Sequence, residues 1–490
     1  MKGSSFAAAV GFLSAPIANA GGTVQWDIQK HHHPIARSGK RDTSTYYEDV
    51  SNDISSGGYF ASCTLGTPGQ NMTLLLDTGS SDVWVPGYMA NLCEECPSSE
   101  TDIDVAVNSS DSSTFINIGE GDFDISYVDG SYSKGDYFKD TFEIAGATVS
   151  NLTMGLGTNT TLTYGVVGVG YKYSEAIVET ESLSSAYPNL PLAMVNQGLI
   201  ATNAYSLWLN DLDASTGSIL FGGIDTEKYT GDLIAVDILE NSESHQYDTF
   251  LVNFTSIQAI SDSGTDELTS REFPLEVVLD SGTTLSYIPT DLAQQMWTEV
   301  GALYVADVDL ALVPCNMRKS EGSFTFGFAG STGPRVTLTT DELVRDLVVI
   351  GPAPTFSSGE YRGEDACVFG IQNSSTYPYL LGDTFLRSAY VVYDLVNNQI
   401  AIAQTDFNGT GSNIVPFESN GAHIPSATMA SNQSLATATS TVTEPTYAAA
   451  SGFMNGTSVG SMMVSPSGEH LAVVGVAMLM SLFGGGLFLA

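Results

Sequence analysis

The chain has 490 residues and is strongly acidic, with 55 Asp and Glu against 16 Lys and Arg and a formal net charge of −39. A surface of that charge repels nucleic acid and anionic membranes, which argues against a nucleic-acid partner. The length suits two lobes plus processing segments, and 49 glycines with only 14% charged residues favour a β-rich protein with many turns.

The amino-terminal region carries two processing signals. Residues 1–20 combine a charged start, a short apolar stretch and an A-x-A cleavage motif, which is typical of a signal peptide. Residues 21–41 contain His31–His33 and end at the dibasic pair Lys40 and Arg41. A basic cluster beside so acidic a remainder indicates a pro-segment that covers an acidic cleft, although a leader without a binding partner is the alternative.

Two stretches of the chain repeat one pattern, an apolar strand that runs into Asp-Thr/Ser-Gly. The strand Met72–Leu76 precedes Asp77, and the strand Leu275–Leu279 precedes Asp280. Each loop is followed by a second apolar segment and, further on, by an apolar-apolar-Gly element. One half therefore mirrors the other, and a two-fold arrangement would bring the Asp loops face to face. A third copy, Asp262–Thr265, lacks these flanking segments, and we expect it to be a surface loop.

Taken together, these features resemble the pepsin family of aspartic proteases, and more closely its fungal yapsin and candidapepsin-like branch, whose anchored members share this layout. The resemblance covers about residues 59–403. It includes Gly66–Pro68, Phe221–Asp225 and Leu380–Leu386 besides the two Asp loops. It implies polypeptide substrates and no cofactor.

The resemblance also implies a fold, an all-β bilobal acid protease with a central cleft. Residues 42–213 would form the N-terminal catalytic lobe and residues 214–417 the C-terminal lobe. Short helices would follow some strands, as at Thr290–Val300, and helical turns after Gly168 and Gly382 would support the catalytic loops.

The chemistry of paired carboxyl groups can be argued from the residues alone. Two carboxylates at one site cannot both ionise cheaply, so Asp77 and Asp280 would share a proton. The ionised member would take a proton from a water that attacks the peptide carbonyl, and the protonated member would donate to the carbonyl oxygen. This route uses no metal, nucleotide or acyl-enzyme.

Small residues beside both aspartates are expected to support them. The glycine of each loop lets backbone N–H groups approach the carboxylate. The resemblance implies that the hydroxyl residue after each glycine bonds the outer carboxylate oxygen, and that the one before it cross-links the loops. Ordinary turn chemistry is the alternative. These supporting residues are Thr78, Gly79, Ser80, Ser281, Gly282 and Thr283.

Residues 126–131 carry a turn signal, Asp129-Gly130, between strand-like segments, which predicts a hairpin. The resemblance makes this hairpin a flap over the substrate, with Tyr127 bonded toward Trp84. A carboxylate at Asp129, close to a substrate pocket, would favour Lys or Arg in the substrate. This agrees with the preference of yapsin-like enzymes for basic residues.

Five cysteines are present, and secretion would allow two disulfides. Cys93 and Cys96 could close a small loop, and Cys315 and Cys367 a long one, which leaves Cys63 as a buried thiol. A zinc site is the rival interpretation of the C-x-x-C pair. No second C-x-x-C or H-x-x-x-H accompanies it, so metal binding is disfavoured.

The carboxyl-terminal region predicts a tether to the cell surface. Residues 418–455 are rich in Ser, Thr, Ala and Asn and contain no Lys or Arg, which predicts a disordered, O-glycosylated stalk. Residues 456–490 end in an apolar run that no basic residue follows, which favours a removable GPI-attachment signal over a transmembrane anchor. Asn455 is a candidate site for the GPI lipid.

Three functions were compatible with paired carboxyl groups in this setting. The first is an active endopeptidase, which we expect to be monomeric, to work at acidic pH and to reach the outer cell face through the secretory pathway. The second, a two-carboxylate glycosidase, does not require twin Asp loops in mirrored halves. The third, an inactive pepsin-fold binding protein, is disfavoured because both aspartates and the flap Tyr127 are kept.

Overall fold

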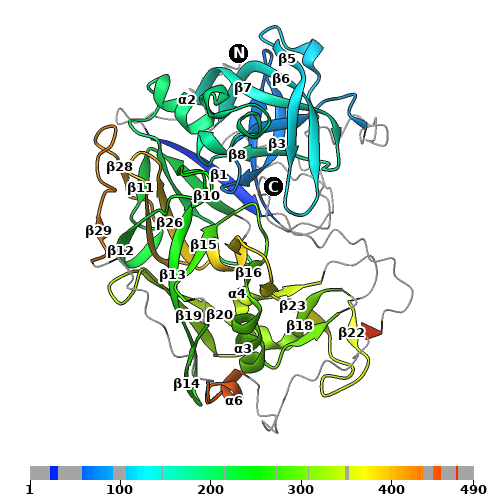
Figure 1. Cartoon of the computed structure of the whole chain (residues 1–490), viewed down its shortest axis with the longest axis vertical. Helices are drawn as coiled ribbons and strands as arrows, with labels where there is room; N and C mark the ends of the chain where they lie inside the picture. The colour runs from blue at the N-terminus through cyan, green and yellow to red at the C-terminus, as the bar shows by residue number, and fades with distance from the viewer. Residues whose placement is uncertain are drawn as a thin grey trace, which may run out of the picture.

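The computed structural model describes residues 23–30, 58–91, 106–144, 147–214, 216–270, 273–306, 308–347, 353–431, 433, 445–453 and 471–472. Strands dominate these residues and build two lobes, joined by one long sheet, as Figure 1 shows. The expected all-β bilobal fold is confirmed. In the described part of the chain, no helix has both the length and the apolar character needed to cross a membrane.

The N-terminal lobe consists of seven strands and two short α-helices, with the strands buried on their inner faces. Its elements are β2 (Tyr59–Leu65), β3 (Gln70–Asp77), β4 (Val83–Pro86), β5 (Ile116–Ser126), β6 (Tyr132–Ile144), β7 (Ala147–Thr160), β8 (Gly165–Gly168), α1 (Ala176–Thr180) and α2 (Leu190–Asn196). Strand β3 is buried from Met72 to Asp77 without alternation, which is typical of a strand covered on both faces.

The C-terminal lobe carries a sheet of eight strands and a smaller one of four. Its elements are β13 (Leu251–Ser261), β14 (Gly264–Leu268), β15 (Leu275–Leu279), β16 (Ser286–Pro289), α3 (Thr290–Val300), β17 (Leu303–Val305), β18 (Leu310–Pro314), β19 (Ser323–Phe328), β20 (Arg335–Thr339), α4 (Thr340–Leu343), β21 (Val344–Asp346), β22 (Thr355–Phe356), β23 (Ala366–Phe369), β24 (Ile371–Ser374), β25 (Tyr379–Leu381) and α5 (Asp383–Leu386). The helix predicted at Thr290–Val300 is confirmed, and it ends where Gly301 adopts a left-handed φ of 67°.

A central group of strands joins the lobes. It contains β1 (Val24–Lys30), β9 (Ala204–Trp208), β10 (Thr216–Phe221), β11 (Gly223–Asp225), β12 (Tyr229–Asp237), β26 (Ala389–Asp394), β27 (Gln399–Thr405), β28 (Ile414–Pro416) and β29 (Ala427–Met429). The long sheet runs β29-β12-β27-β26-β9-β10-β1-β2-β3-β8-β4-β7-β6-β5. The expected lobe boundary at residue 213 falls between β9 and β10, which pair with each other.

Strand β1 comes from within the expected pro-segment. It pairs antiparallel with β10 over residues 24–29 and with β2 over residues 28–30. This part of the leader therefore lies inside the sheet, between β10 and β2. His31–His33 and the dibasic pair Lys40 and Arg41 lie outside the described residues.

The prediction of a disordered stalk over residues 418–455 is wrong for its described parts. Strand β29 pairs parallel with β12, and the Gln433 side chain accepts the Asp237 N–H at 2.8 Å. Residues 445–453 contact the C-terminal lobe and end in α6 (Ala450–Phe453). Tertiary contacts hold these segments although their composition is typical of a linker. In the region expected as a GPI signal, β30 (Leu471–Ala472) pairs with β22, and Asn455 lies outside the described residues.

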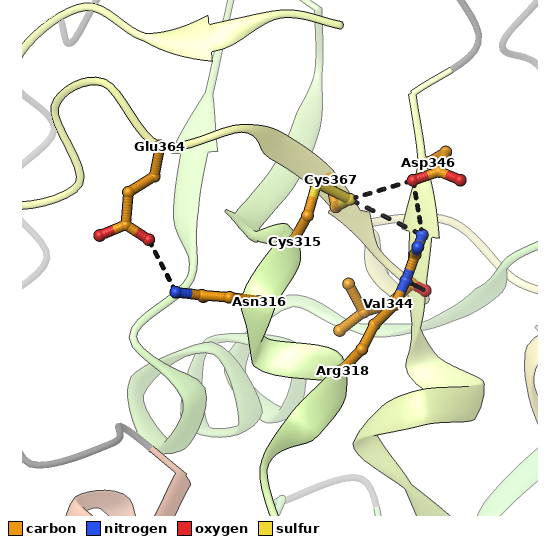
Figure 2. Close-up of a disulfide and its surroundings, with 7 residues drawn as sticks. All are labelled: Cys315, Asn316, Arg318, Val344, Asp346, Glu364 and Cys367. Carbon is orange, nitrogen blue, oxygen red and sulfur yellow. Dashed lines mark hydrogen bonds and ion pairs between the residues drawn. A yellow bond between two sulfur atoms is a disulfide. The ribbon is translucent and has the colours of Figure 1, made fainter.

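One of the two expected disulfides is present. Cys315 and Cys367 are joined, with a Cα–Cα distance of 5.0 Å, and the bridge ties the 3₁₀-helix Cys315–Lys319 to β23 (Figure 2). Beside it, Arg318 donates to the Asp346 carboxylate at 2.7 Å. Both sulfur atoms are in the bridge, so these cysteines and Asp346 do not form a thiolate metal site. Cys63 is buried, and Cys93 and Cys96 lie outside the described residues.

Candidate active site

The first Asp loop is positioned by two parallel strands. Asp77 is the last residue of β3 and lies level with Gly168 at the end of β8. A Cβ on Gly168 would come within 2.6 Å of the Ser81 nitrogen, so only glycine lets β8 lie so close to the loop. The Asp77 Oδ1 accepts the Gly79 N–H at 2.7 Å, and its Oδ2 accepts the Ser80 hydroxyl.

The second Asp loop repeats this arrangement in the other lobe. Asp280 follows β15, which lies parallel to β25. Its Oδ1 accepts the Gly282 N–H at 2.8 Å, and its Oδ2 accepts the Thr283 hydroxyl. A Cβ on Gly382 would come within 2.2 Å of the Thr283 carbonyl oxygen. The two halves therefore hold their carboxyl groups with matching bonds.

Hydrogen bonds lock the two loops together. The Thr78 N–H donates to the Ser281 Oγ at 3.2 Å, and the Ser281 N–H donates to the Thr78 Oγ1 at 2.9 Å. Each hydroxyl then donates to a carbonyl of the opposite strand, Thr78 to Leu279 at 3.1 Å and Ser281 to Leu76 at 2.9 Å. These four bonds fix the relative position of the loops and leave both carboxyl groups directed at one place.

The two aspartates meet in a buried pair. Both side chains are fully buried, and the two carboxyl groups lie near enough to interact electrostatically. Burial, followed by the negative charge of Asp280, raises the pKa of Asp77 well above its ordinary value. Burial also raises the pKa of Asp280, although the Thr283 and Gly282 bonds oppose it. Two buried carboxyl groups that interact in this way cannot both ionise cheaply, so one of them keeps its proton and the pair can act as acid and base together.

The predicted flap is the hairpin of β5 and β6. The Tyr127 N–H donates to the Ser131 carbonyl at 2.9 Å, and Gly130 takes a φ of 83° in the turn. The Trp84 indole donates to the Tyr127 hydroxyl at 2.7 Å, so the bond expected between these residues is present. Burial, and after it the negative charge of Asp77, raises the pKa of Tyr127.

Asp129 lies at the tip of this hairpin and is partly tied to it. Its Oδ1 accepts both the N–H and the hydroxyl of Ser131, at 2.8 and 2.6 Å. Burial raises the pKa of Asp129. Its charge in turn contributes to the raised pKa of Tyr287, about 12, after burial and the charge of Asp309. Asp129 is therefore close to β16 of the opposite lobe.

Sequence reasoning missed a buried polar group behind the flap. Asp82 accepts the Ala176 N–H at 2.8 Å and the Tyr187 hydroxyl, and Glu175 accepts the Tyr187 N–H at 2.8 Å. Burial raises the pKa of Asp82 to about 6 and, with the charge of Asp82, that of Glu175 to about 10. The only local signal was an acidic residue directly before the apolar segment Val83–Pro86.

Comparisons with known proteins agree with this geometry. The family model "Eukaryotic aspartyl protease" matches residues 58–405. The "Probable aspartic-type endopeptidase opsB" of Aspergillus fumigatus is 40% identical over 377 residues, which is 76% of this chain and 74% of the relative. The "Acid protease" of Saccharomycopsis fibuligera is 35% identical, over 71% and 81% of the two chains. "Secreted aspartic protease 8" of Candida albicans is 33% identical, over 72% and 77%.

The matched residues span both Asp loops, the flap hairpin and the strands that carry them. The chain therefore belongs to the eukaryotic aspartyl protease family.

Proposed function

We propose that this chain is an active aspartic endopeptidase in which Asp77 and Asp280 activate the attacking water. The observation that carries the proposal is the buried carboxyl pair, held by matching bonds in two loops that are hydrogen-bonded to each other. Thr78, Gly79, Ser80, Ser281, Gly282 and Thr283 would hold the pair in place.

The proposed reaction needs only water and the peptide. The ionised carboxylate takes a proton from the water, and the water oxygen forms a bond to the carbonyl carbon while the protonated carboxyl donates to the carbonyl oxygen. The tetrahedral intermediate then breaks its C–N bond. The amine leaves with a proton from one carboxyl group, the other carboxylate takes a proton from a hydroxyl of the intermediate as the new carboxylic acid forms, and the pair again shares one proton.

The test is an assay at about pH 4 on an unstructured protein substrate, with and without pepstatin, using purified mature enzyme and its Asp77→Asn variant. We expect cleavage that pepstatin blocks and that the variant lacks. If a folded wild-type protein cleaves nothing across acidic pH, the enzyme proposal fails and the inactive binding protein gains support. Cleavage that survives in Asp77→Asn would instead remove the role assigned to that residue.

We further propose that Asp129 gives a preference for Lys or Arg near the scissile bond. Its position at the flap tip, near β16, supports this proposal. Asp129→Ala should reduce cleavage after Lys relative to cleavage after Leu or Phe in a peptide library. Because burial raises the pKa of Asp129, the preference should be weaker at pH 4 than at pH 6.

A matched control exists on the same hairpin. Asp124 pairs with Lys134 at 2.7 Å on the exposed part of β5 and β6, away from the turn. Asp124→Ala makes the same change of charge and should leave the selectivity unaltered. Equal selectivity in the wild type and Asp129→Ala would refute the role of Asp129.

We also propose that the enzyme is secreted and held at the outer cell face by a GPI lipid. The relative named as a secreted protease supports secretion, and the apolar carboxyl-terminal run supports the lipid. Treating intact cells with a phosphatidylinositol-specific phospholipase should release the enzyme into the medium. Retention on the cells after treatment, with a known GPI protein released in parallel, would contradict the lipid anchor.

A further inference from the structure

Residues 445–453 lie against the outer end of the C-terminal lobe, which is the end farthest from the N-terminal lobe. Figure 1 shows α6 there, beside β14 and α3. We call this segment the clasp. It belongs to the region whose composition predicts disorder, and it takes no part in the proposed catalysis. Its contacts with the lobe are nevertheless specific, and they involve both backbone and side-chain atoms.

Asp266 of β14 binds the first half of the clasp. Its Oδ1 accepts the N–H and the hydroxyl of Thr446, at 3.1 and 2.7 Å, and its Oδ2 accepts the Ala449 N–H at 2.8 Å. Burial alone would raise the pKa of Asp266, but the bonds from Ala449 and Thr446 outweigh it and lower the pKa. A nearly buried carboxylate therefore accepts three hydrogen bonds from the clasp, and it also interacts with Glu299 of α3.

The third Asp-Ser-Gly-Thr copy, expected to be a plain surface loop, is the turn between β13 and β14 and binds the clasp backbone. The Ser261 hydroxyl donates to the Ala449 carbonyl at 2.6 Å, and the Ser263 hydroxyl donates to the Ala448 carbonyl at 2.7 Å. The Gly452 N–H donates to the Ser263 Oγ at 3.1 Å. Backbone groups of the clasp are therefore satisfied by side chains of the lobe.

The last residue of the clasp fills an apolar pocket. Phe453 is 1% exposed and stacks on Phe324, with ring centroids 5.0 Å apart. A Cβ on Gly322 would come within 2.2 Å of the Phe453 ring, so the pocket depends on a glycine at that position. Burial of a whole Phe side chain is a large stabilising contribution for so short a segment.

We propose that Asp266, Ser263 and the Gly322–Phe324 pocket form a binding site for the segment 445–453, which holds the carboxyl-terminal end of the chain on the catalytic body. Gln433 is held by the body as well, through its bond with the Asp237 N–H. Any tether to a carboxyl-terminal attachment point then begins after Phe453, at the end of the C-terminal lobe, and does not begin at residue 418.

Hydrogen exchange of the intact, full-length mature protein tests this inference. Peptides covering residues 445–453 should exchange at least about 100-fold more slowly than an unstructured reference. Asp266→Ala, which removes three acceptor contacts, and Gly322→Val, which fills the pocket, should each speed this exchange at least about 10-fold. Ser451→Ala is the matched control, because Ser451 is an exposed side chain of the same segment, and it should exchange like the wild type.

Two checks separate loss of the clasp from loss of folding. Proteolytic activity and exchange in β13 and β19 should stay at wild-type values in every variant. If Asp266→Ala or Gly322→Val misfolds, the exchange of Phe453→Ala tests the proposal instead, because this substitution alters only the clasp. Wild-type exchange at the unstructured rate would overturn the proposal, and so would wild-type protection retained in both Gly322→Val and Phe453→Ala.

Discussion

The two halves of the molecule hold their aspartates alike but surround them differently. Five residues after Asp77 lies Asp82, which accepts bonds from Tyr187 and Ala176, whereas five residues after Asp280 lies Leu285 in an apolar cluster. Seven residues after the first aspartate lies Trp84, whose indole binds the flap. The Asp loops, which the two halves share, account for the chemistry. Trp84, which only the N-terminal half has, supports the flap.

The largest expected effect comes from breaking the shared part. Asp77→Asn and Asp280→Asn should each lower kcat by about 10³-fold or more, and the double variant should be little worse, because the carboxyl groups act as one unit. Single-turnover assays on one peptide, with circular dichroism to check folding, would measure this. A variant that keeps a tenth of the wild-type rate would show that the halves are not equivalent.

The next effect concerns Asp82, which the C-terminal half lacks. Burial raises the pKa of Asp82 to about 6, so the folded protein binds this proton more tightly than the unfolded chain. The resulting stability is complete below about pH 4 and is lost as pH rises to about 6, which amounts to at most about 3 kcal/mol. Asp82→Asn should remove this pH dependence, because an amide does not titrate. Any destabilisation that the amide causes should be the same at both pH values.

Urea unfolding at pH 4 and pH 7 would measure this difference, and Asp124→Asn is the control because that carboxylate is exposed on a hairpin. The difference in unfolding free energy between the two pH values should shrink in Asp82→Asn but not in the control. Identical pH dependence in the wild type and Asp82→Asn would show that Asp82 titrates alike in the folded and unfolded chains.

The smallest effect distinguishes Trp84 from its counterpart Tyr287. Tyr127→Phe leaves the buried Trp84 N–H without its acceptor and should lower kcat/KM by about 10-fold, because an unsatisfied buried donor costs roughly 1–3 kcal/mol. Tyr287→Phe removes a hydroxyl from the other half and should cost less than about 2-fold. Equal losses measured on one peptide would contradict the idea that only the N-terminal half supports the flap.

Much of the site could be predicted from sequence because its residues lie in short, repeated motifs. The Asp loops, their glycines and hydroxyl residues, and the Asp129-Gly130 turn are each local patterns. In the structure, hydrogen bonds join the two Asp loops, and Gly130 takes a positive φ in its turn. The bond between Trp84 and Tyr127 followed from the family resemblance. The helix after β16 was also expected within its observed bounds.

What sequence missed depends on contacts between distant residues. Asp82 and Tyr187 are 105 positions apart, and no local pattern pairs them. The clasp has the composition of a linker, and its order comes from Asp266 and a pocket at Gly322, far away in the chain. Strand β1 is held by its pairing with β10 and β2. The sequence of the leader alone does not reveal these partner strands.

The direction of the bond between Trp84 and Tyr127 has a chemical consequence. An indole nitrogen can only donate, so the phenol oxygen is the acceptor, and Tyr127 keeps its own hydrogen for another partner. Withdrawal of electron density by the indole makes that hydrogen a better donor. Burial, with the negative charge of Asp77, raises the pKa of this phenol, so it keeps that hydrogen and remains a donor.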